Sequence, residues 1–91
     1  MIDEYYLYTF ESTHGAIATE TLFKPIGCMV MPVPRAISTS CGIAVRVSPD
    51  IMPESADLFR KESDLEPNEY KVYHIRHDKD SDHLEYEVFE I

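Results

Sequence analysis

Runs of apolar residues in the first half of the chain alternate between strand and helix character. The aromatic run Tyr5–Phe10 predicts a first strand. Ala16–Lys24 predicts a helix that ends before Pro25, with a mixed rather than a clean apolar stripe. Cys28–Val33 predicts a second strand. Because Pro32 cannot donate a hydrogen bond to a β-ladder, we expect that strand at the edge of a sheet.

The second half contains the clearest strand pattern, Cys41–Val47. Cys41 shares one face with the alternate apolar residues that follow it, whereas Ala44 and Arg46 share the other. The remaining predictions are a loop at Pro34–Ser40, a helix at Met52–Ser63, a polar loop at Asp64–Glu69, a strand at Tyr70–His77, a turn at Asp78–Asp82 and a strand at Leu84–Ile91.

This order of elements is βαββαβ with one further strand, and it predicts an α+β fold. The split βαβ arrangement, a ferredoxin-like sandwich with an extra C-terminal strand, satisfies it most simply. The expected sheet order is 4-1-3-2, with both helices on one face. This order puts the strand that contains Pro32 at an edge. The chain has no internal repeat, so residues 1–91 are predicted to form a single domain.

Composition narrows the possible functions. The formal net charge of −9 argues against binding to nucleic-acid phosphates. No segment approaches the roughly 18 apolar residues of a membrane span. The first residues, Met1–Glu4, lack the basic start and apolar run of a signal peptide. We therefore expect a cytoplasmic protein in which Cys28 and Cys41 are reduced thiols.

The expected topology brings several polar residues to the sheet edge where the first strand ends and the third begins. They are Ser12, Thr13, His14, Arg35, Ser38, Thr39, Ser40, Cys41 and Gly42. Ser12 and Thr13 are good N-cap residues for the first helix. Side chains alternate between the two faces along its strand, and this alternation places Cys41 on the side of the helices. Its sulfur is therefore expected near the N-terminus of the first helix. The free amides and partial positive charge there favour an anion such as a thiolate.

The neighbours of Cys41 have plausible chemical roles beside it. Arg35 adds positive charge, His14 is able to exchange a proton, and Gly42 permits close approach of the backbone to a bound group. The alternative for Cys41 is a small buried hydrophobic residue. For His14 it is a surface position at a helix start, and for Arg35 a solvated loop cation.

Neither a disulfide nor a metal site is predicted. Strand geometry places Cys28 and Cys41 roughly 15 Å apart, too far for a disulfide. His74 and His77 are three residues apart on a strand and face opposite sides. The acidic turn 78–82 lacks the glycine and terminal glutamate of a calcium loop, so a solvated hairpin tip is expected. No organic cofactor is indicated.

Three motifs carry a resemblance to a known family. They are FESTHGA at Phe10–Ala16, PVPR at Pro32–Arg35 and STSCGIA at Ser38–Ala44. In order and spacing they resemble the selenium/sulfur carrier-like family of short proteins. The resemblance implies that Cys41 carries a persulfide or selenopersulfide, loaded by a donor such as a cysteine desulfurase and unloaded by an acceptor protein. The chain lacks the Cys-Pro motif of the small sulfur carriers of tRNA thiolation.

Two functions are therefore considered. A carrier needs an accessible thiolate in a positive field. The alternative is a non-enzymatic protein-binding or regulatory module that uses an open sheet face. Helices on one side only would leave such a face uncovered, and its aromatic residues suggest a homodimer.

Overall fold

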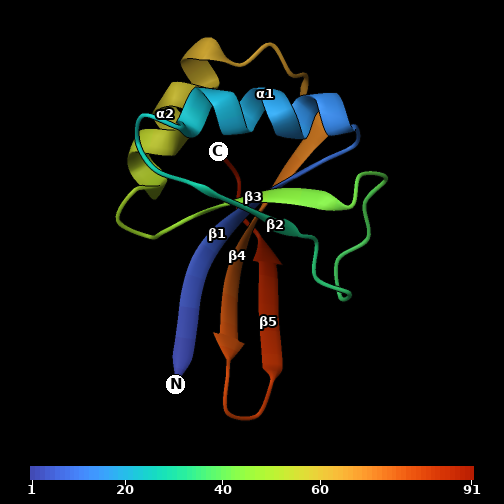
Figure 1. Ribbon diagram of the computed structural model, residues 1–91, viewed down its shortest axis with the longest axis vertical. Coiled ribbons are helices and arrows are strands. Elements are labelled where there is room, and N and C mark those ends of the chain that lie inside the picture. The colour runs from blue at the N-terminus through green and yellow to red at the C-terminus, as the bar shows by residue number, and fades with distance from the viewer.

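The computed structural model describes residues 1–91 as a small α+β fold with one antiparallel sheet and two helices (Figure 1). The strands are β1 (Ile2–Phe10), β2 (Met29–Pro32), β3 (Ile43–Val47), β4 (Tyr70–Asp78) and β5 (His83–Val88). The helices are α1 (Thr13–Phe23), α2 (Met52–Glu62) and the short 3-10 helix η1 (Pro67–Glu69). Neither α1 nor α2 has the length and apolar character needed to cross a bilayer.

The strands follow the order β2-β3-β1-β4-β5, and all neighbours are antiparallel. β1 lies at the centre and pairs with β4 along its whole length, from Ile2 opposite Asp78 to Phe10 opposite Tyr70. β2 forms one edge, as its proline predicts, and β5 forms the other. The β4–β5 hairpin runs away from the helices, so its tip lies at the far end of the long axis (Figure 1).

Both helices pack on one face of the sheet and enclose the main core. Tyr8 and Phe10 of β1 meet Phe23 of α1 and Phe59 of α2, and all four are buried. The Tyr8 ring lies edge-on to that of Phe23 with centroids 5.0 Å apart. α1 presents buried Thr19 as well as apolar residues to this core, which explains why its apolar stripe is not clean.

The second face of the sheet is covered, so the expectation of an open face is wrong. Tyr5, Leu7 and Ile75 are buried there. Ile37, from the segment that joins β2 to β3, packs against them, and Leu84 of β5 adds to the cover. Tyr5 and Tyr73 are therefore not available to a dimer on that face, whereas Tyr86 of β5, opposite Ile75, remains 46% exposed.

Several element ends differ from the predictions. Cys41 lies just before β3, because that strand begins at Ile43. α1 begins at Thr13 rather than Ala16, since the Ser12 side chain caps it. β5 ends at Val88 instead of Ile91. The Phe89 amide still donates to the Val72 carbonyl oxygen at 2.8 Å, in the register of the β4–β5 pair, and Ile91 packs against the helix-side core.

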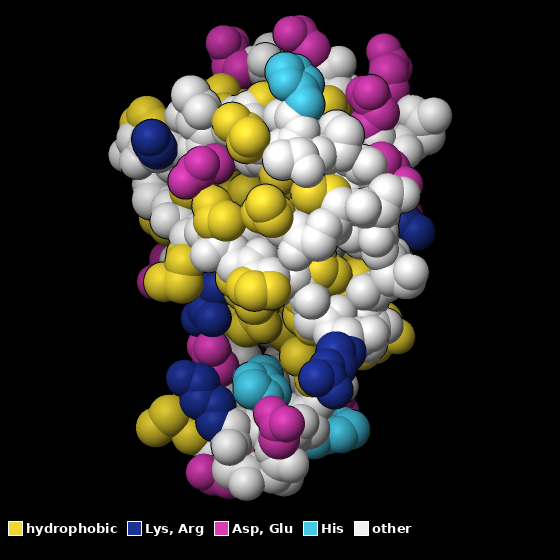
Figure 2. All heavy atoms as spheres, turned by 45° about the vertical axis from the view of Figure 1, so that its right-hand side comes forward, with side chains coloured by type: hydrophobic (Ala, Val, Ile, Leu, Met, Phe, Trp, Pro, Cys, Tyr) yellow, Lys and Arg dark blue, Asp and Glu magenta, His cyan; other side chains and the backbone are white.

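Apolar side chains remain exposed along β2 and on its neighbour β3. We call this surface the β2 edge and define it by Met29, Val30, Pro32 and Ile43. Met29 is 61% and Val30 42% exposed. In Figure 2, which brings this side of the molecule forward, hydrophobic side chains gather across the middle of the face.

Candidate functional site

The site around Cys41 lies where the end of the β2–β3 segment meets the start of α1. The Cys41 sulfur is 3.8 Å from the Thr13 hydroxyl oxygen and 3.7 Å from the Ile43 carbonyl oxygen. The Cys41 side chain joins the helix-side core and is only 4% exposed. It thus lies on the predicted side of the sheet, beside the first residue of α1, but it lacks the accessibility that a carrier thiol needs.

The α1 N-terminus offers a partly positive environment next to this sulfur. The Ser12 hydroxyl accepts from the Gly15 amide at 3.2 Å, and the Ser12 carbonyl accepts from the Ala16 amide at 3.4 Å. This cap leaves the amides of Thr13 and His14 without intrahelical partners. Ser12 therefore acts as a helix cap, and the adjacent free amides favour negative charge at the start of the helix.

Segment 33–42 joins β2 to β3 and carries Cys41, whose side chain points into the helix-side core, whereas Ile37 of the same segment packs on the second face of the sheet. The Thr39 hydroxyl donates to the Cys41 carbonyl oxygen, and the Ser40 hydroxyl donates to the Glu11 carboxylate at 3.1 Å. Ser38 is exposed and makes no hydrogen bond through its side chain. At Gly42 an added Cβ would meet no atom within 4 Å, so the backbone there is open to an approaching group.

His14 and Arg35 lie at the surface and do not contact the Cys41 sulfur through any hydrogen bond or ion pair. His14 lines a hollow of about 240 Å³ between α1 and the segment that follows α2, with Leu65 on its wall. Arg35 is exposed and has no ion-pair partner. In this conformation Thr13, which was also expected at this edge, is the polar side chain next to the thiol, and His14 and Arg35 are not.

Cys28 is the other free thiol and is half-buried near the opposite end of α1. Its sulfur lies 3.9 Å from the Glu20 carbonyl oxygen. Burial raises the pKa of the Cys28 thiol, and the nearby Glu20 carboxylate adds to the shift. Cys28 is therefore the more exposed cysteine but is disfavoured as a thiolate.

Residues 5–71 match the model of a family described as "Putative Se/S carrier protein-like". The chain belongs to this family. The match spans α1, both cysteines and the whole β2–β3 segment, and it ends just inside β4. No curated protein and no solved structure matches the chain.

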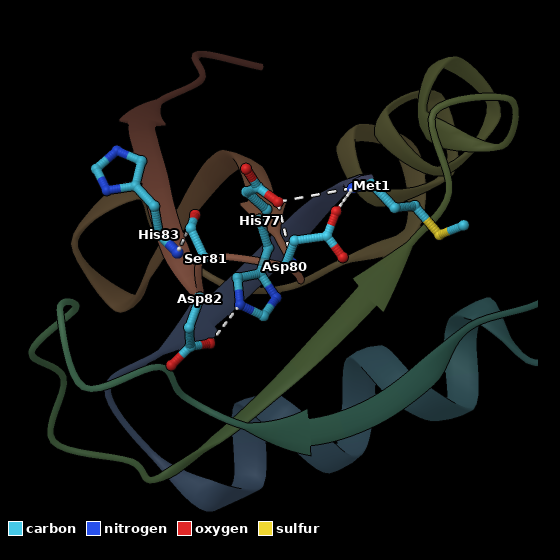
Figure 3. Close-up of polar contacts among 7 residues, drawn as sticks. Met1, His77, Asp80, Ser81, Asp82 and His83 are labelled. Atoms are coloured by element: carbon cyan, nitrogen blue, oxygen red, sulfur yellow. Dashed lines mark hydrogen bonds and ion pairs between the residues drawn. The ribbon is translucent and has the colours of Figure 1, made fainter.

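The histidines of the β4–β5 hairpin lie outside the residues matched to the Se/S carrier-like family. His77 pairs with Asp82 at 2.8 Å, and the Met1 ammonium pairs with Asp80 at 2.6 Å (Figure 3). His74 stacks on Tyr6 and reaches a different carboxylate, that of Glu4. No three His, Cys, Asp or Glu side chains are arranged to hold a metal ion.

Sequence reasoning missed one residue of the site. Glu11 holds segment 33–42 through the Ser40 hydroxyl. Thr39, which was expected at this sheet edge, donates to the backbone of Cys41 itself. Both lie in motifs that carry the likeness to the Se/S carrier-like family. A signal was available for Glu11: it is the only acidic residue among the three motifs.

Proposed function

We propose that this protein carries sulfur or selenium on Cys41, as a persulfide or selenopersulfide, between a donor and an acceptor protein. Membership of the Se/S carrier-like family supports this role. The observation that carries the assignment to Cys41 is the 3.8 Å approach of its sulfur to the Thr13 hydroxyl at the α1 N-terminus. Cys28 has no comparable setting.

The loading step is a transfer of one sulfane sulfur atom. The Cys41 thiolate attacks the outer sulfur of a donor cysteine persulfide, such as that of a cysteine desulfurase. A new sulfur–sulfur bond forms on Cys41, the donor bond breaks, and the donor cysteine leaves as a thiolate. Unloading repeats the exchange with an acceptor thiolate. No external oxidant or reductant is needed, but the thiols must be reduced, which suits the cytoplasm.

The site provides three kinds of help for this chemistry. The free amides at the start of α1 favour the thiolate and the persulfide anion. The Thr13 hydroxyl is able to donate to either anion. Arg35, which has no ion-pair partner, is available to pair with anionic groups of a docked protein. His14, at the N-terminus of α1, is available to exchange a proton with that protein.

Burial of Cys41 has two consequences for the carrier. A bound sulfane sulfur is shielded from water and small thiols, which limits its loss. Loading, however, needs segment 33–42 to move so that the Cys41 thiol leaves the helix-side core. We propose that a docked donor or acceptor stabilises the opened arrangement, in which the Ser40–Glu11 contact is broken.

Mass spectrometry of the intact protein tests the role. After incubation with a cysteine desulfurase and cysteine, the protein is expected to gain the mass of one sulfur atom. Cys41→Ser is expected to abolish the gain, whereas Cys28→Ser keeps it. Sulfur found on Cys28, or none found on the native protein, would overturn the assignment.

We further infer that the fold is of the ferredoxin-like class. Read from β4 to β2, the strand order is 4-1-3-2, and both helices pack on one face. β5 is then an addition beyond β4. A solved structure with a different strand order would remove this classification without affecting the chemistry at Cys41.

A further inference from the structure

The outer side of β2 has unpaired backbone groups. The Val33 amide donates to the Gly42 carbonyl at 3.0 Å, so Val33 points its backbone groups toward β3. Because successive residues of an antiparallel strand point opposite ways, Val30 and Pro32 point theirs outward. The outward groups are the amide and carbonyl of Val30 and the carbonyl of Pro32. They are free to accept an added strand.

The two edges of the sheet are protected differently. β5, at the far edge, carries the charged side chains of Glu85 and Glu87, which discourage strand addition. β2 carries no charged side chain at all, and Ile43, which pairs with Pro32, is exposed. Its shortness and Pro32 limit how many strand bonds a partner forms. β2 is thus a short, apolar edge that is open to one partner strand.

Charge along the chain indicates the chemistry of that partner. Residues 21–49 contain no Asp or Glu and three basic residues, so this stretch carries +3 while the rest of the chain carries −12. Arg46 is already paired with Asp3 at 2.9 Å. The other two, Lys24 before β2 and Arg35 after it, are exposed and have no ion-pair partner. One free cation therefore flanks each end of the apolar edge.

We propose that the β2 edge binds an extended segment of a partner protein, with alternating apolar and acidic residues, as an added sixth strand. The apolar side chains fit against Val30 and Ile43, and the acidic ones meet Lys24 and Arg35. A second copy of this chain fits less well. Symmetric pairing would bring like cations together, and each copy as a whole carries −9.

The position of the edge links it to Cys41. β2 ends at Pro32, opposite Ile43, and segment 33–42, which carries Cys41, starts there. A strand added to β2 therefore ends next to the segment that must move to expose Cys41. This link rests on the proposed carrier function, whereas binding of the strand does not.

Fluorescence anisotropy with a labelled heptapeptide, Glu-Val-Glu-Ile-Glu-Val-Glu with blocked ends, tests the proposal. We expect saturable binding that weakens with added salt, and binding about tenfold weaker for the same peptide with Lys in place of Glu. Val30→Pro removes an outward amide but no bond to β3, and it is expected to weaken binding about tenfold. Lys24→Glu with Arg35→Glu should weaken it too, without altering the strand.

The same titration on Cys41→Ser separates this inference from the carrier function, because strand binding needs no thiol. Failure of Cys41→Ser to take up sulfur leaves the peptide result unaffected. Three outcomes would overturn the inference: no binding of the acidic peptide, equal binding of both peptides, or unchanged binding by both variants. Light scattering that gives a dimer abolished by Val30→Pro would assign the edge to a second copy instead.

Discussion

Cys41 and Cys28 differ in what limits their reactivity. Cys41 lies beside the α1 N-terminus, but its side chain is buried in the helix-side core. Cys28 is more exposed, but burial and Glu20 raise its pKa. Access therefore limits Cys41, whereas ionisation limits Cys28.

This difference predicts distinct kinetics of alkylation by iodoacetamide. The rate at Cys41 is expected to level off as reagent concentration rises, because opening of segment 33–42 becomes limiting. The rate at Cys28 should rise linearly with reagent, and its pH profile should lie at higher pH than that of a free cysteine. Peptide mapping by mass spectrometry measures both sites. Linear kinetics at Cys41 with the rate constant of a free cysteine would show that the segment does not protect it.

Ser40→Ala tests what holds the segment closed. The change removes the hydroxyl that donates to the Glu11 carboxylate, so the plateau rate at Cys41 is expected to rise several-fold, as loss of about 1 kcal/mol would allow. Thr21→Ala is the matched control, since its hydroxyl bonds only to the Ile17 carbonyl on an exposed turn of α1. An equal effect of both changes would point to general destabilisation.

Tyr8 predicts how stability depends on alkaline pH. Its hydroxyl lies 2.8 Å from that of Ser55, and burial raises its pKa from 10.0 to about 12. Because the folded pKa exceeds the unfolded one, the stability from neutral Tyr8 is complete below pH 10 and is lost as pH rises to about 12.

Tyr8→Phe should lower the free energy of unfolding by about 1 kcal/mol at neutral pH and make its fall above pH 10 shallower. Urea unfolding at several pH values measures both effects. Tyr86→Phe, on the exposed hairpin, should change neither. An unaltered pH dependence in Tyr8→Phe would mean that other groups cause the alkaline loss.

At the scale of elements, the start of α1 depends on Ser12. Ser12→Ala removes the acceptor for the Gly15 amide and is expected to cost about 1 kcal/mol, whereas Ser12→Gly should cost only a few tenths. Thermal unfolding followed by circular dichroism measures the difference. If Ser12 instead binds a partner or substrate, both variants would keep full stability and lose sulfur uptake.

Patterns within a single element were sufficient to predict much of this fold. Pro32 indicated an edge strand, and alternation after Cys41 indicated which side of the sheet its sulfur faces; both are confirmed. The covered second face was missed because Ile37 reaches it from a loop, where no periodicity marks a buried residue. Ile91 was assigned to a strand because its return to the core depends on contacts distant in sequence. For the same reason the contact between Glu11 and Ser40 was missed.

At the scale of the whole molecule, the family match ends before the fold is complete. Residues 1–71 keep only the first two residues of β4, so β1 loses nearly all of one neighbour. We expect this fragment to be unfolded, with flat near-ultraviolet circular dichroism and both cysteines alkylated at free-cysteine rates. Residues 1–82 keep β4 and should stay folded. A folded 1–71 fragment would show that β3 and the helices suffice to hold β1.

The central position of β1 also bears on how the protein is made. β1 leaves the ribosome before the other four strands, yet Ile2 can pair with Asp78 only when Asp78 has been synthesised. Until then the nascent chain holds an aromatic strand without a complete sheet, and such distant pairings form slowly. We expect the growing chain to depend on chaperones that shield this strand, and slower translation of residues 70–78 to lengthen that dependence.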